Sequence, residues 1–377
     1  MIVCLRKGHT QQQLAEVIRR IEAKGCRPHI SAGNEETIVG LIGETKGIDK
    51  SLFTELPWVD RVVRISRPYK LVSREHQPQT RTIRIGRDLA IGGGGVLLIA
   101  GPCSVEGMEM LLSLAEACKR SGARMLRGGA YKPRSSPYAF QGLGREGIRC
   151  LVEARRRTGM PIVTEATGNH HHIGRDGVPE ERSVLEEVLS STDVLQIGTR
   201  NMKSYGFLEE VARTTGERGI PVLLKRGEYA TLEEFLLAAE YIVLNGNPDV
   251  ILCLRGLRSL ESPRFLRYSP DIGAIPVLKH ETNLPVIFDP SHATGDRRYV
   301  RAVALAAIAA GADGLMIETH EDPERAWSDG QECITPDELR RIAEEVRGIE
   351  AIRACAVACP AEPAPAGLPH GSQRAIP

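Results

Sequence analysis

The sequence lacks an excess of charge of either sign. Its 377 residues include 49 lysines and arginines against 48 aspartates and glutamates. A nucleic-acid-binding protein or a membrane-surface protein usually carries a clear positive excess, so neither class is indicated here. The basic residues therefore have to be interpreted by their positions in the chain.

Long apolar runs and cysteine pairs are also missing. No apolar stretch reaches the roughly 18 residues of a membrane-spanning helix, and the start MIVCLRKGH lacks a cationic segment followed by a long apolar one. The nine cysteines include no CxxC pair, which argues against a disulfide framework and a structural zinc site. We expect a cytoplasmic protein with reduced thiols that binds neither membranes nor nucleic acid.

The usual cofactor and nucleophile motifs are absent or misplaced. The glycines at 92–95 are not followed by the Lys-Ser or Lys-Thr pair of a phosphate-binding loop, and no GxSxG nucleophile motif occurs. The segment GLGREG at 142–147 matches the dinucleotide fingerprint formally. That fingerprint requires a helix directly after a strand, whereas the polar segment YKPRSSPYAFQ precedes these glycines. We interpret it as a coincidental match.

What the sequence does contain is a series of short apolar runs at intervals of about 30 residues, the length of one strand-helix unit. Each run is rich in Val, Ile and Leu, as expected for strands buried on both faces of a parallel sheet. Eight such units form a (β/α)8 barrel, an α/β fold whose active site lies at the carboxyl ends of the strands. The runs are VLLIAGPC (96–103), RMLRGG (124–129), PIVTE (161–165), VLQIGTR (194–200), PVLLKR (221–226), VILCLR (250–255), PVIFDPSH (285–292) and LMIE (315–318).

The remaining residues indicate further parts. Residues 1–66 have the strand and helix order βαββαβ of a small ferredoxin-like domain. We interpret residues 67–95 as a linker with short strands, in which the four consecutive glycines form a hinge, and residues 96–350 as the barrel. Residues 351–377 are rich in alanine and proline and are expected to be a disordered tail.

The predicted strand ends bring together a mixed set of metal ligands. Cys103, His292 and Glu318 end three strands, and Asp329 follows the last. A thiolate, an imidazole and two carboxylates suit Mn, Fe, Co or Zn better than Mg or Ca. His320 is a rival ligand because it lies two residues beyond Glu318, on the same strand face.

A second group at the strand ends is cationic and indicates a substrate with several negative charges, such as a phosphorylated acid. A metal beside a polyanion pocket favours polarisation of a carbonyl for attack by a nucleophile. The residues alone thus predict a metal-dependent lyase or aldol-type transferase, with a Schiff base on Lys225 still open. The cations are Arg127, Lys132, Arg134, Arg200, Lys225 and Arg255.

Several long motifs resemble a known family in order and spacing: AGPCSVE, LRGGAYKPRSSPYAFQGLG, QIGTRNM, PVLLKRG, ILCLRG, DPSHATG and AAGADGLMIETH. They are similar to 3-deoxy-D-arabino-heptulosonate 7-phosphate (DAHP) synthases of class I. The resemblance extends from Met1 to about Gly348. It includes the ferredoxin-like regulatory domain of one branch, through MIVCLRKG, HISAG, GLIGE and RPYKLVSRE.

The resemblance implies condensation of phosphoenolpyruvate with erythrose 4-phosphate, the first step of the shikimate pathway to chorismate and the aromatic amino acids. It implies metal binding by Cys103, His292, Glu318 and Asp329, and so favours Glu318 over His320. Lys132, Cys103 and His292 are implied to be catalytic, and Lys132 is implied to protonate the new alkoxide. Other implied contacts are Arg200 and Arg255 with the phosphate of phosphoenolpyruvate, Arg127, Lys132 and Lys225 with its carboxylate, and Arg134 and Ser135 with the aldose phosphate.

The chain departs from the family pattern at three places near the implied aldose site. Ser135 replaces the usual Thr, Leu254 replaces the usual Glu, and SPRFLRYSPD at 262–271 replaces a TRNTLD-like segment. An apparent insertion at about 168–183 carries His170, His171 and His172. We predict a solvated loop there rather than a second metal site, because three adjacent histidines cannot all face one ion from a strand or helix.

Alternatives remain at the level of substrate and function. One is a sister synthase that uses arabinose 5-phosphate; Pro133, where that relative typically has asparagine, favours the heptulosonate product. Another is a non-catalytic amino-acid sensor. The resemblance also implies feedback inhibition by tyrosine or phenylalanine through the N-terminal domain and a homo-oligomer, commonly a tetramer.

Overall fold

A computed structural model describes the chain over residues 1–32, 37–45, 47–64, 68–132, 138–168, 171–173, 179–258 and 265–358. Two of the predicted site residues, Arg134 and Ser135, lie outside these ranges. So do Pro133, His170 and part of the segment 262–271.

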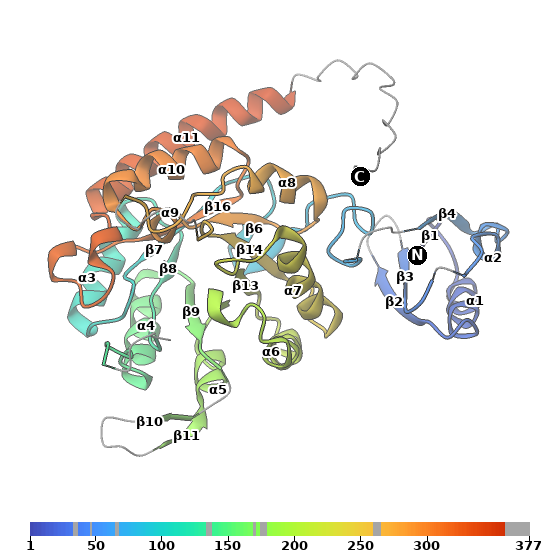
Figure 1. Ribbon diagram of the computed structural model, residues 1–377, viewed down its shortest axis with the longest axis horizontal. Coiled ribbons are helices and arrows are strands. Elements are labelled where there is room, and N and C mark those ends of the chain that lie inside the picture. Colours follow the sequence, from blue (N-terminus) through green and yellow to red (C-terminus); the bar gives the residue numbers. More distant parts are fainter. Residues whose placement is uncertain are drawn as a thin grey trace, which may run out of the picture.

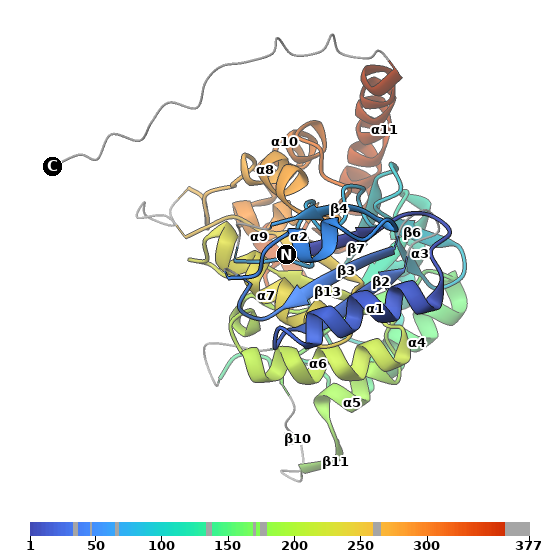
Figure 2. The same ribbon diagram turned by 90° about the vertical axis from the view of Figure 1, so that its right-hand side faces the viewer.

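The N-terminal domain is a four-stranded sheet covered by helices on one face (Figures 1 and 2). Its strand order is β2-β3-β1-β4, and every pair of neighbouring strands is antiparallel. This is the predicted ferredoxin-like arrangement. The elements are β1 (Ile2–Leu5), α1 (Gln11–Glu22), β2 (Arg27–Ala32), β3 (Thr37–Ile42), α2 (Ser51–Thr54) and β4 (Val59–Val63).

Local sequence explains how helix α1 begins and packs. Thr10 and Gln13 form a reciprocal capping box at its start, which satisfies two otherwise unpaired backbone N–H groups. Val17 and Ile21 lie one turn apart and are fully buried against the sheet. The apolar spacing of this helix therefore fixes which face it buries.

The larger part of the chain is a closed barrel of eight parallel strands, which confirms the predicted (β/α)8 fold. Neighbouring strands are consecutive around the barrel, and the last pairs with the first through β16 and β7. The strands are β7 (Leu97–Gly101), β8 (Met125–Arg127), β9 (Ile162–Ala166), β12 (Val194–Ile197), β13 (Val222–Lys225), β14 (Val250–Leu254), β15 (Val286–Phe288) and β16 (Gly314–Glu318).

Helices surround this barrel on the outside (Figure 1). The main ones are α3 (Met108–Arg120), α4 (Arg145–Thr158), α5 (Val184–Leu189), α6 (Tyr205–Arg218), α7 (Leu232–Leu244), α8 (Ala274–Glu281), α10 (Arg297–Ala309) and α11 (Pro336–Ala358). A short helix α9 (Pro290–Thr294) and the 3-10 turns η1 (Thr199–Asn201), η2 (Pro323–Arg325) and η3 (Gly330–Glu332) lie in the loops after the strands.

The segment that we predicted as a linker is part of the barrel domain. Strands β5 (Ile83–Ile85) and β6 (Leu89–Ile91) form an antiparallel hairpin, and its three isoleucines, Ile83, Ile85 and Ile91, are buried against the inner side chains of the barrel. Arg81 N donates to the carbonyl of Asn283, just before β15. The hairpin therefore closes the amino-terminal end of the barrel, opposite the end where an active site is expected.

Two further predictions need correction. The insertion predicted as a loop contains a short antiparallel ladder between β10 (His171–Ile173) and β11 (Pro179–Ser183), which projects from the barrel next to α5 (Figure 1). The predicted tail is helical at its start, because α11 continues to Ala358. Residues 351–358 contain several alanines and no proline, so the composition that suggested disorder favours helix there.

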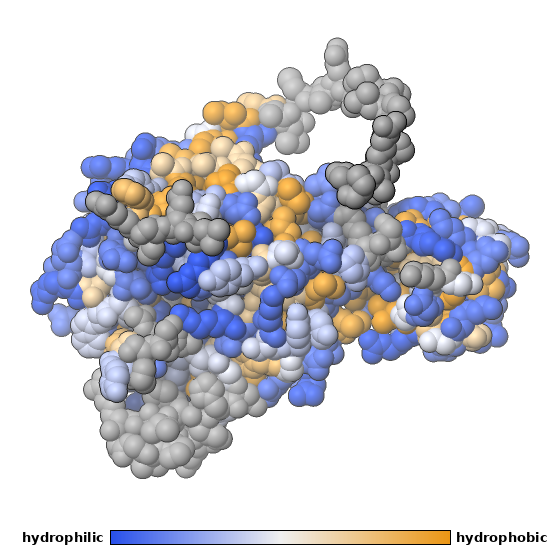
Figure 3. Space-filling model, viewed as in Figure 1, coloured by the Kyte–Doolittle hydropathy of each residue, from blue (hydrophilic) through white to orange (hydrophobic). Residues whose placement is uncertain are grey.

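The surface in Figure 3 is mostly hydrophilic, and apolar residues appear on this face in separate groups. None of the helices in the described ranges has the length and apolarity needed to cross a bilayer. The cysteines within those ranges are free thiols.

Candidate metal centre and anion pocket

The functional side chains follow from the alternation of residues along the barrel strands. Side chains two residues apart point to the same side of a strand. On β8 and β16, Met125 and Met316 belong to the apolar filling of the barrel, so Arg127 and Glu318 also point inward, one layer nearer the carboxyl ends. On β13, Leu223 also belongs to this filling, so Lys225, two residues later, points inward as well. An apolar layer therefore supports a layer of charged groups.

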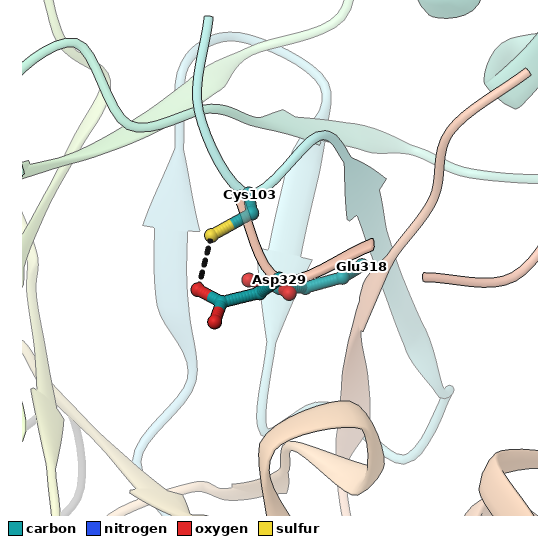
Figure 4. Close-up of side chains that lie close together, drawn as sticks. All are labelled: Cys103, Glu318 and Asp329. Atoms are coloured by element: carbon teal, nitrogen blue, oxygen red, sulfur yellow. Dashed lines mark hydrogen bonds between the residues drawn. The ribbon is translucent and has the colours of Figure 1, made fainter. Parts of the chain in front are cut away.

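The predicted thiol and carboxylates meet at the top of the barrel (Figure 4). Cys103 Sγ lies 3.0 Å from Asp329 Oδ2, and the possible ligand atoms of Cys103, Asp329 and Glu318 lie within 4.8 Å of one another. Lys132 Nζ is 3.0 Å from both Sγ and the carbonyl oxygen of Cys103. The three side chains come from segments far apart in the sequence, so only the closed barrel brings them together.

His292 completes the predicted ligand set through helix α9. Asp289 caps this helix by accepting from His292 N at 3.0 Å, Pro290 occupies its first turn, and Gly295 ends it with a left-handed φ of 67°. This short turn places His292 Nε2 3.6 Å from Glu318 Oε1. The motif DPSHATG therefore encodes the local structure that presents the imidazole.

Two residues of the site were missed by the sequence reasoning. Asp289 is fully buried; its Oδ2 accepts from Lys225 Nζ at 2.5 Å and lies 2.8 Å from His292 Nδ1. Glu332 is also fully buried, and its ligand atom lies within 4.8 Å of those of His292 and Glu318. Asp289 could have been found by alternation, since it follows the inward-facing Ile287 by two residues. Glu332 lies in a turn with no such signal.

The rival ligand His320 is occupied elsewhere. Its Nδ1 accepts from Asp322 N at 3.0 Å, and its Nε2 lies 3.5 Å from Glu106 Oε2. The adjacent carboxylate of Glu106 raises the pKa of His320. Spacing alone could not choose between Glu318 and His320, and the described contacts favour Glu318.

The chemistry of this donor set fits a divalent metal. Glu318 Oε2 is buried without a hydrogen-bond partner in the described ranges, which is costly unless something else binds it. Burial, and next the nearby Glu318, raise the pKa of the Cys103 thiol to about 12. Because a cation favours the thiolate, an ion bound here would relieve both features.

Electrostatics also set the protonation of the neighbouring acids and bases. Burial lowers the pKa of His292, which favours the neutral imidazole that metals bind. Burial would raise the pKa of Glu318, but His292 and Arg127 lower it overall. Burial and the repulsion of Glu318 raise the pKa of Glu332 well above its usual range.

A cavity of about 310 Å³ opens beside this centre. Of the six predicted cations, five line it: Arg127, Lys132, Arg200, Lys225 and Arg255. The sixth, Arg134, lies outside the described residues. Glu165, Gln196, Glu228 and Arg267 also line the cavity, and His292 and Asp329 connect it to the metal-ligand cluster.

Arg255, one of the cations that line the cavity, has donors that could bind an anion. Its guanidinium stacks over the ring of Tyr268 at 3.9 Å from the centroid. Its Nε and Nη1 atoms are buried without a hydrogen-bond partner in the described ranges, although Glu228 Oε1 lies 3.9 Å from Nη1. Arg255 lines the cavity, and unsatisfied guanidinium donors favour a phosphate or carboxylate as partner.

Comparison with known proteins shows the family to which the chain belongs. Residues 72–353 match the model of the DAHP synthetase I family. The chain belongs to this family. Residues 1–67 match the DAHP synthase ferredoxin-like domain, so both parts of the chain have counterparts among DAHP synthases.

Individual relatives support the assignment to the family. The chain is 43% identical to a phospho-2-dehydro-3-deoxyheptonate aldolase from Thermotoga maritima over 347 residues, which is 92% of this chain and 97% of that protein. The crystal structure of the phospho-2-dehydro-3-deoxyheptonate aldolase (DAHP synthase) from Thermotoga maritima aligns with a TM-score of 0.69 and 41% identity, over 93% of this chain and 97% of that one. A 2-dehydro-3-deoxyphosphooctonate aldolase from Methylococcus capsulatus is 31% identical, over 66% of this chain and 87% of that protein.

Proposed function

We propose that the protein condenses phosphoenolpyruvate with erythrose 4-phosphate to give 3-deoxy-D-arabino-heptulosonate 7-phosphate and inorganic phosphate, as the first step of the shikimate pathway. The observation that carries this proposal is the cavity in which five cations adjoin a thiol, an imidazole and carboxylates. The 43% identity with the heptonate aldolase, over nearly the whole of both chains, supports the choice of reaction.

The cations have distinct tasks in this proposal. Arg200 and Arg255 bind the phosphate of phosphoenolpyruvate, and the unsatisfied donors of Arg255 support that assignment. Arg127, Lys132 and Lys225 bind its carboxylate. Positioning two mutually repelling phosphorylated substrates at fixed distance can supply several kcal/mol of barrier reduction.

Cys103, His292, Glu318 and Asp329 are proposed to hold a divalent Mn, Fe, Co or Zn ion. Such an ion supplies a Lewis acid that polarises the aldehyde of the aldose. C3 of phosphoenolpyruvate attacks the aldehyde carbon, water adds at C2, and loss of phosphate leaves the C2 ketone. Lys132 donates a proton to the alkoxide formed from the aldehyde. Burial would lower the pKa of Lys132, but Cys103 and Glu318 raise it overall. The amine is therefore protonated at neutral pH and able to donate.

The aldose phosphate is proposed to contact Arg134 and Ser135. The octulosonate relatives, at about 30% identity, make arabinose 5-phosphate the second candidate. The departures from the family pattern at Ser135, Leu254 and 262–271 are proposed to affect the choice of aldose. Leu254 is fully buried, so its effect on the aldose would have to be indirect.

The N-terminal domain is proposed to be regulatory, with tyrosine or phenylalanine as the effector, and the protein to act as a homo-oligomer, commonly a tetramer in this family. Because both proposed substrates are phosphorylated metabolites, we also propose a cytoplasmic location.

The test is an assay of the metal-loaded protein with phosphoenolpyruvate and each aldose, which follows the loss of the enolpyruvate absorbance. We expect turnover with erythrose 4-phosphate, no comparable turnover with arabinose 5-phosphate, and loss of activity in Cys103→Ala and after chelation. Turnover with arabinose 5-phosphate alone would assign the sister reaction. No turnover with either aldose, despite bound metal and phosphoenolpyruvate, would contradict the proposal.

A further inference from the structure

Glu332 is a buried carboxylate next to the proposed metal centre that the motifs of the family do not include. It ends the short turn η3, which begins directly after Asp329. Asp329 itself has a left-handed φ of 51°, the one such value for a non-glycine residue in the described ranges. A left-handed residue reverses the chain sharply, and this reversal directs Glu332 back into the barrel mouth.

The surroundings of Glu332 match those of a ligand. His292 Nε2 lies 3.6 Å from Glu318 Oε1 and 3.9 Å from Glu332 Oε1. Two ligand atoms that each lie about 2.1 Å from one ion are separated by roughly 3 to 4 Å. Both distances from His292 Nε2 therefore fit two ligands of a shared ion, and the ligand atoms of all three residues lie within 4.8 Å of one another. The Nδ1 side of His292 is turned away toward Asp289.

Arg267 holds Glu332 in this position. Its Nη1 donates to both carboxylate oxygens of Glu332, at 3.0 and 3.1 Å, and lies 3.6 Å from Asp329 Oδ1. One guanidinium thus orders two carboxylates on the same side of the cluster. Glu318 Oε2 has no hydrogen-bond partner in the described ranges, and the described contacts of Arg267 are with Glu332 and Asp329 rather than with this oxygen. The unpaired oxygen is therefore an independent sign that a cation binds among these acids.

We propose that Glu332 is a fifth metal-binding side chain of this centre, oriented by Arg267. This inference rests on the metal centre proposed above and goes beyond its four ligands. A third carboxylate adds a hard oxygen donor to a set that otherwise contains a soft thiolate and an imidazole. Hard oxygen donors favour Mn²⁺ over Zn²⁺, so Glu332 shifts the selectivity of the centre toward Mn²⁺.

The test compares metal affinities of the full chain by competition with a chromogenic chelator. Glu332→Gln removes the carboxylate that would bind the ion and keeps the shape of the side chain. We expect it to weaken Mn²⁺ binding by about 10- to 100-fold, a range typical of groups that support a metal site, and to weaken Zn²⁺ binding less. The visible absorption of bound Co²⁺, which reports ligand number and type, should also change.

A matched control is Glu106→Gln, the same substitution at another acid of the barrel mouth. Glu106 faces His320 and accepts from Trp327 N at 2.8 Å, and the side-chain carbonyl of glutamine can keep that hydrogen bond. We expect its Mn²⁺ affinity to be that of the wild type. If Glu332→Gln does not fold without metal, Glu332→Asp keeps the charge next to Arg267, shortens the side chain by one methylene and should still weaken Mn²⁺ binding.

Wild-type Mn²⁺ affinity and an unchanged Co²⁺ spectrum in Glu332→Gln or Glu332→Asp would overturn the inference and leave Glu332 as the structural partner of Arg267. Cys103→Ala separates this failure from that of the proposed centre. If Cys103→Ala loses metal and the Glu332 variants do not, only the fifth ligand is wrong. If Cys103→Ala binds metal as the wild type does, the proposed centre itself is wrong.

Discussion

The carboxylate of Asp289 lies 2.8 Å from Nδ1 of His292. The same oxygen accepts from Lys225 Nζ at 2.5 Å, so one buried carboxylate connects the imidazole of the proposed metal centre to a cation that lines the cavity. Burial would raise the pKa of Asp289, but His292 and Lys225 lower it well below its usual range. Asp289 therefore stays ionised, and it orients His292 so that Nε2 faces Glu318.

Asp289→Asn should weaken metal binding by about 10- to 100-fold, since a carboxylate that orients a metal-binding histidine contributes roughly this much. The side-chain carbonyl of asparagine can still cap helix α9, so the fold should persist. Competition with a chelator measures the effect. Asp313→Asn is the control, because Asp313 pairs with Lys279 at the opposite end of the barrel and should leave metal affinity unchanged. Wild-type affinity in Asp289→Asn would contradict the prediction.

Gly198→Ala should lower kcat/KM at least tenfold while the protein stays folded. A Cβ at this position would lie 1.9 Å from Glu165 Oε1, so the carboxylate has to move and lose its hydrogen bond from Gln196. Because both residues line the cavity, substrates would be displaced, and shifts of about 1 Å can cost about 100-fold in rate.

The control for this change is Gly206→Ala in helix α6, where an added Cβ meets open space. Steady-state kinetics should be unchanged there, and circular dichroism should confirm that both variants fold. Full activity in Gly198→Ala would show that Glu165 and its surroundings tolerate displacement.

Ile85→Ala should destabilise the barrel by about 2–5 kcal/mol, the usual cost of truncating a buried isoleucine. Ile85 is fully buried between the hairpin and the inner barrel residues. Urea unfolding measures the change. Arg84→Ala in the same strand is exposed and should change stability by no more than about 0.5 kcal/mol. Equal midpoints for the two variants would mean that the hairpin does not belong to the cooperative barrel core.

His76 should make the protein less stable as the pH falls from about 6.5 to 4. Burial lowers the pKa of its imidazole to about 4, against about 6.5 in an unfolded chain. Between these values the unfolded chain binds more protons, so the free energy of unfolding decreases with falling pH. The full contribution, about 3 kcal/mol, is present above pH 6.5 and is lost at pH 4.

Urea unfolding of the metal-free protein across this pH range measures that contribution as the difference between the wild type and His76→Gln. The variant should show a smaller decrease in stability than the wild type. His280→Gln, at a side chain that is 83% exposed, should follow the wild type. Parallel curves for wild type and His76→Gln would contradict the assignment of this pH dependence to His76.

The architecture was largely predictable because each barrel strand is encoded locally. A short apolar run between polar helices leaves few alternatives, and all eight predicted strands are present. Residues such as Arg127, Lys225 and Glu318 could be identified because they stand at the carboxyl ends of predicted strands, where a barrel has its active site.

The hairpin that closes the barrel was not predictable in this way. Its isoleucines Ile83, Ile85 and Ile91 alternate with other residues as in any half-buried strand. The local sequence does not indicate which part of the protein packs against them. They are buried because residues before the first barrel strand return under the barrel, a contact between segments far apart in the sequence.

Periodicity and strand position are local properties, so they were enough to predict the (β/α)8 fold, the ferredoxin-like domain and most of the charged groups at the barrel mouth. The tertiary structure alone decided that Asp289 joins His292 to Lys225, that His320 pairs with Glu106, and that Glu332 with Arg267 lies against the metal-ligand cluster. The local sequence around a carboxylate in a polar turn looks the same whether the carboxylate is exposed on the surface or buried in a functional site. Its burial, and with it its chemistry, depends on which distant groups the folded chain brings to it.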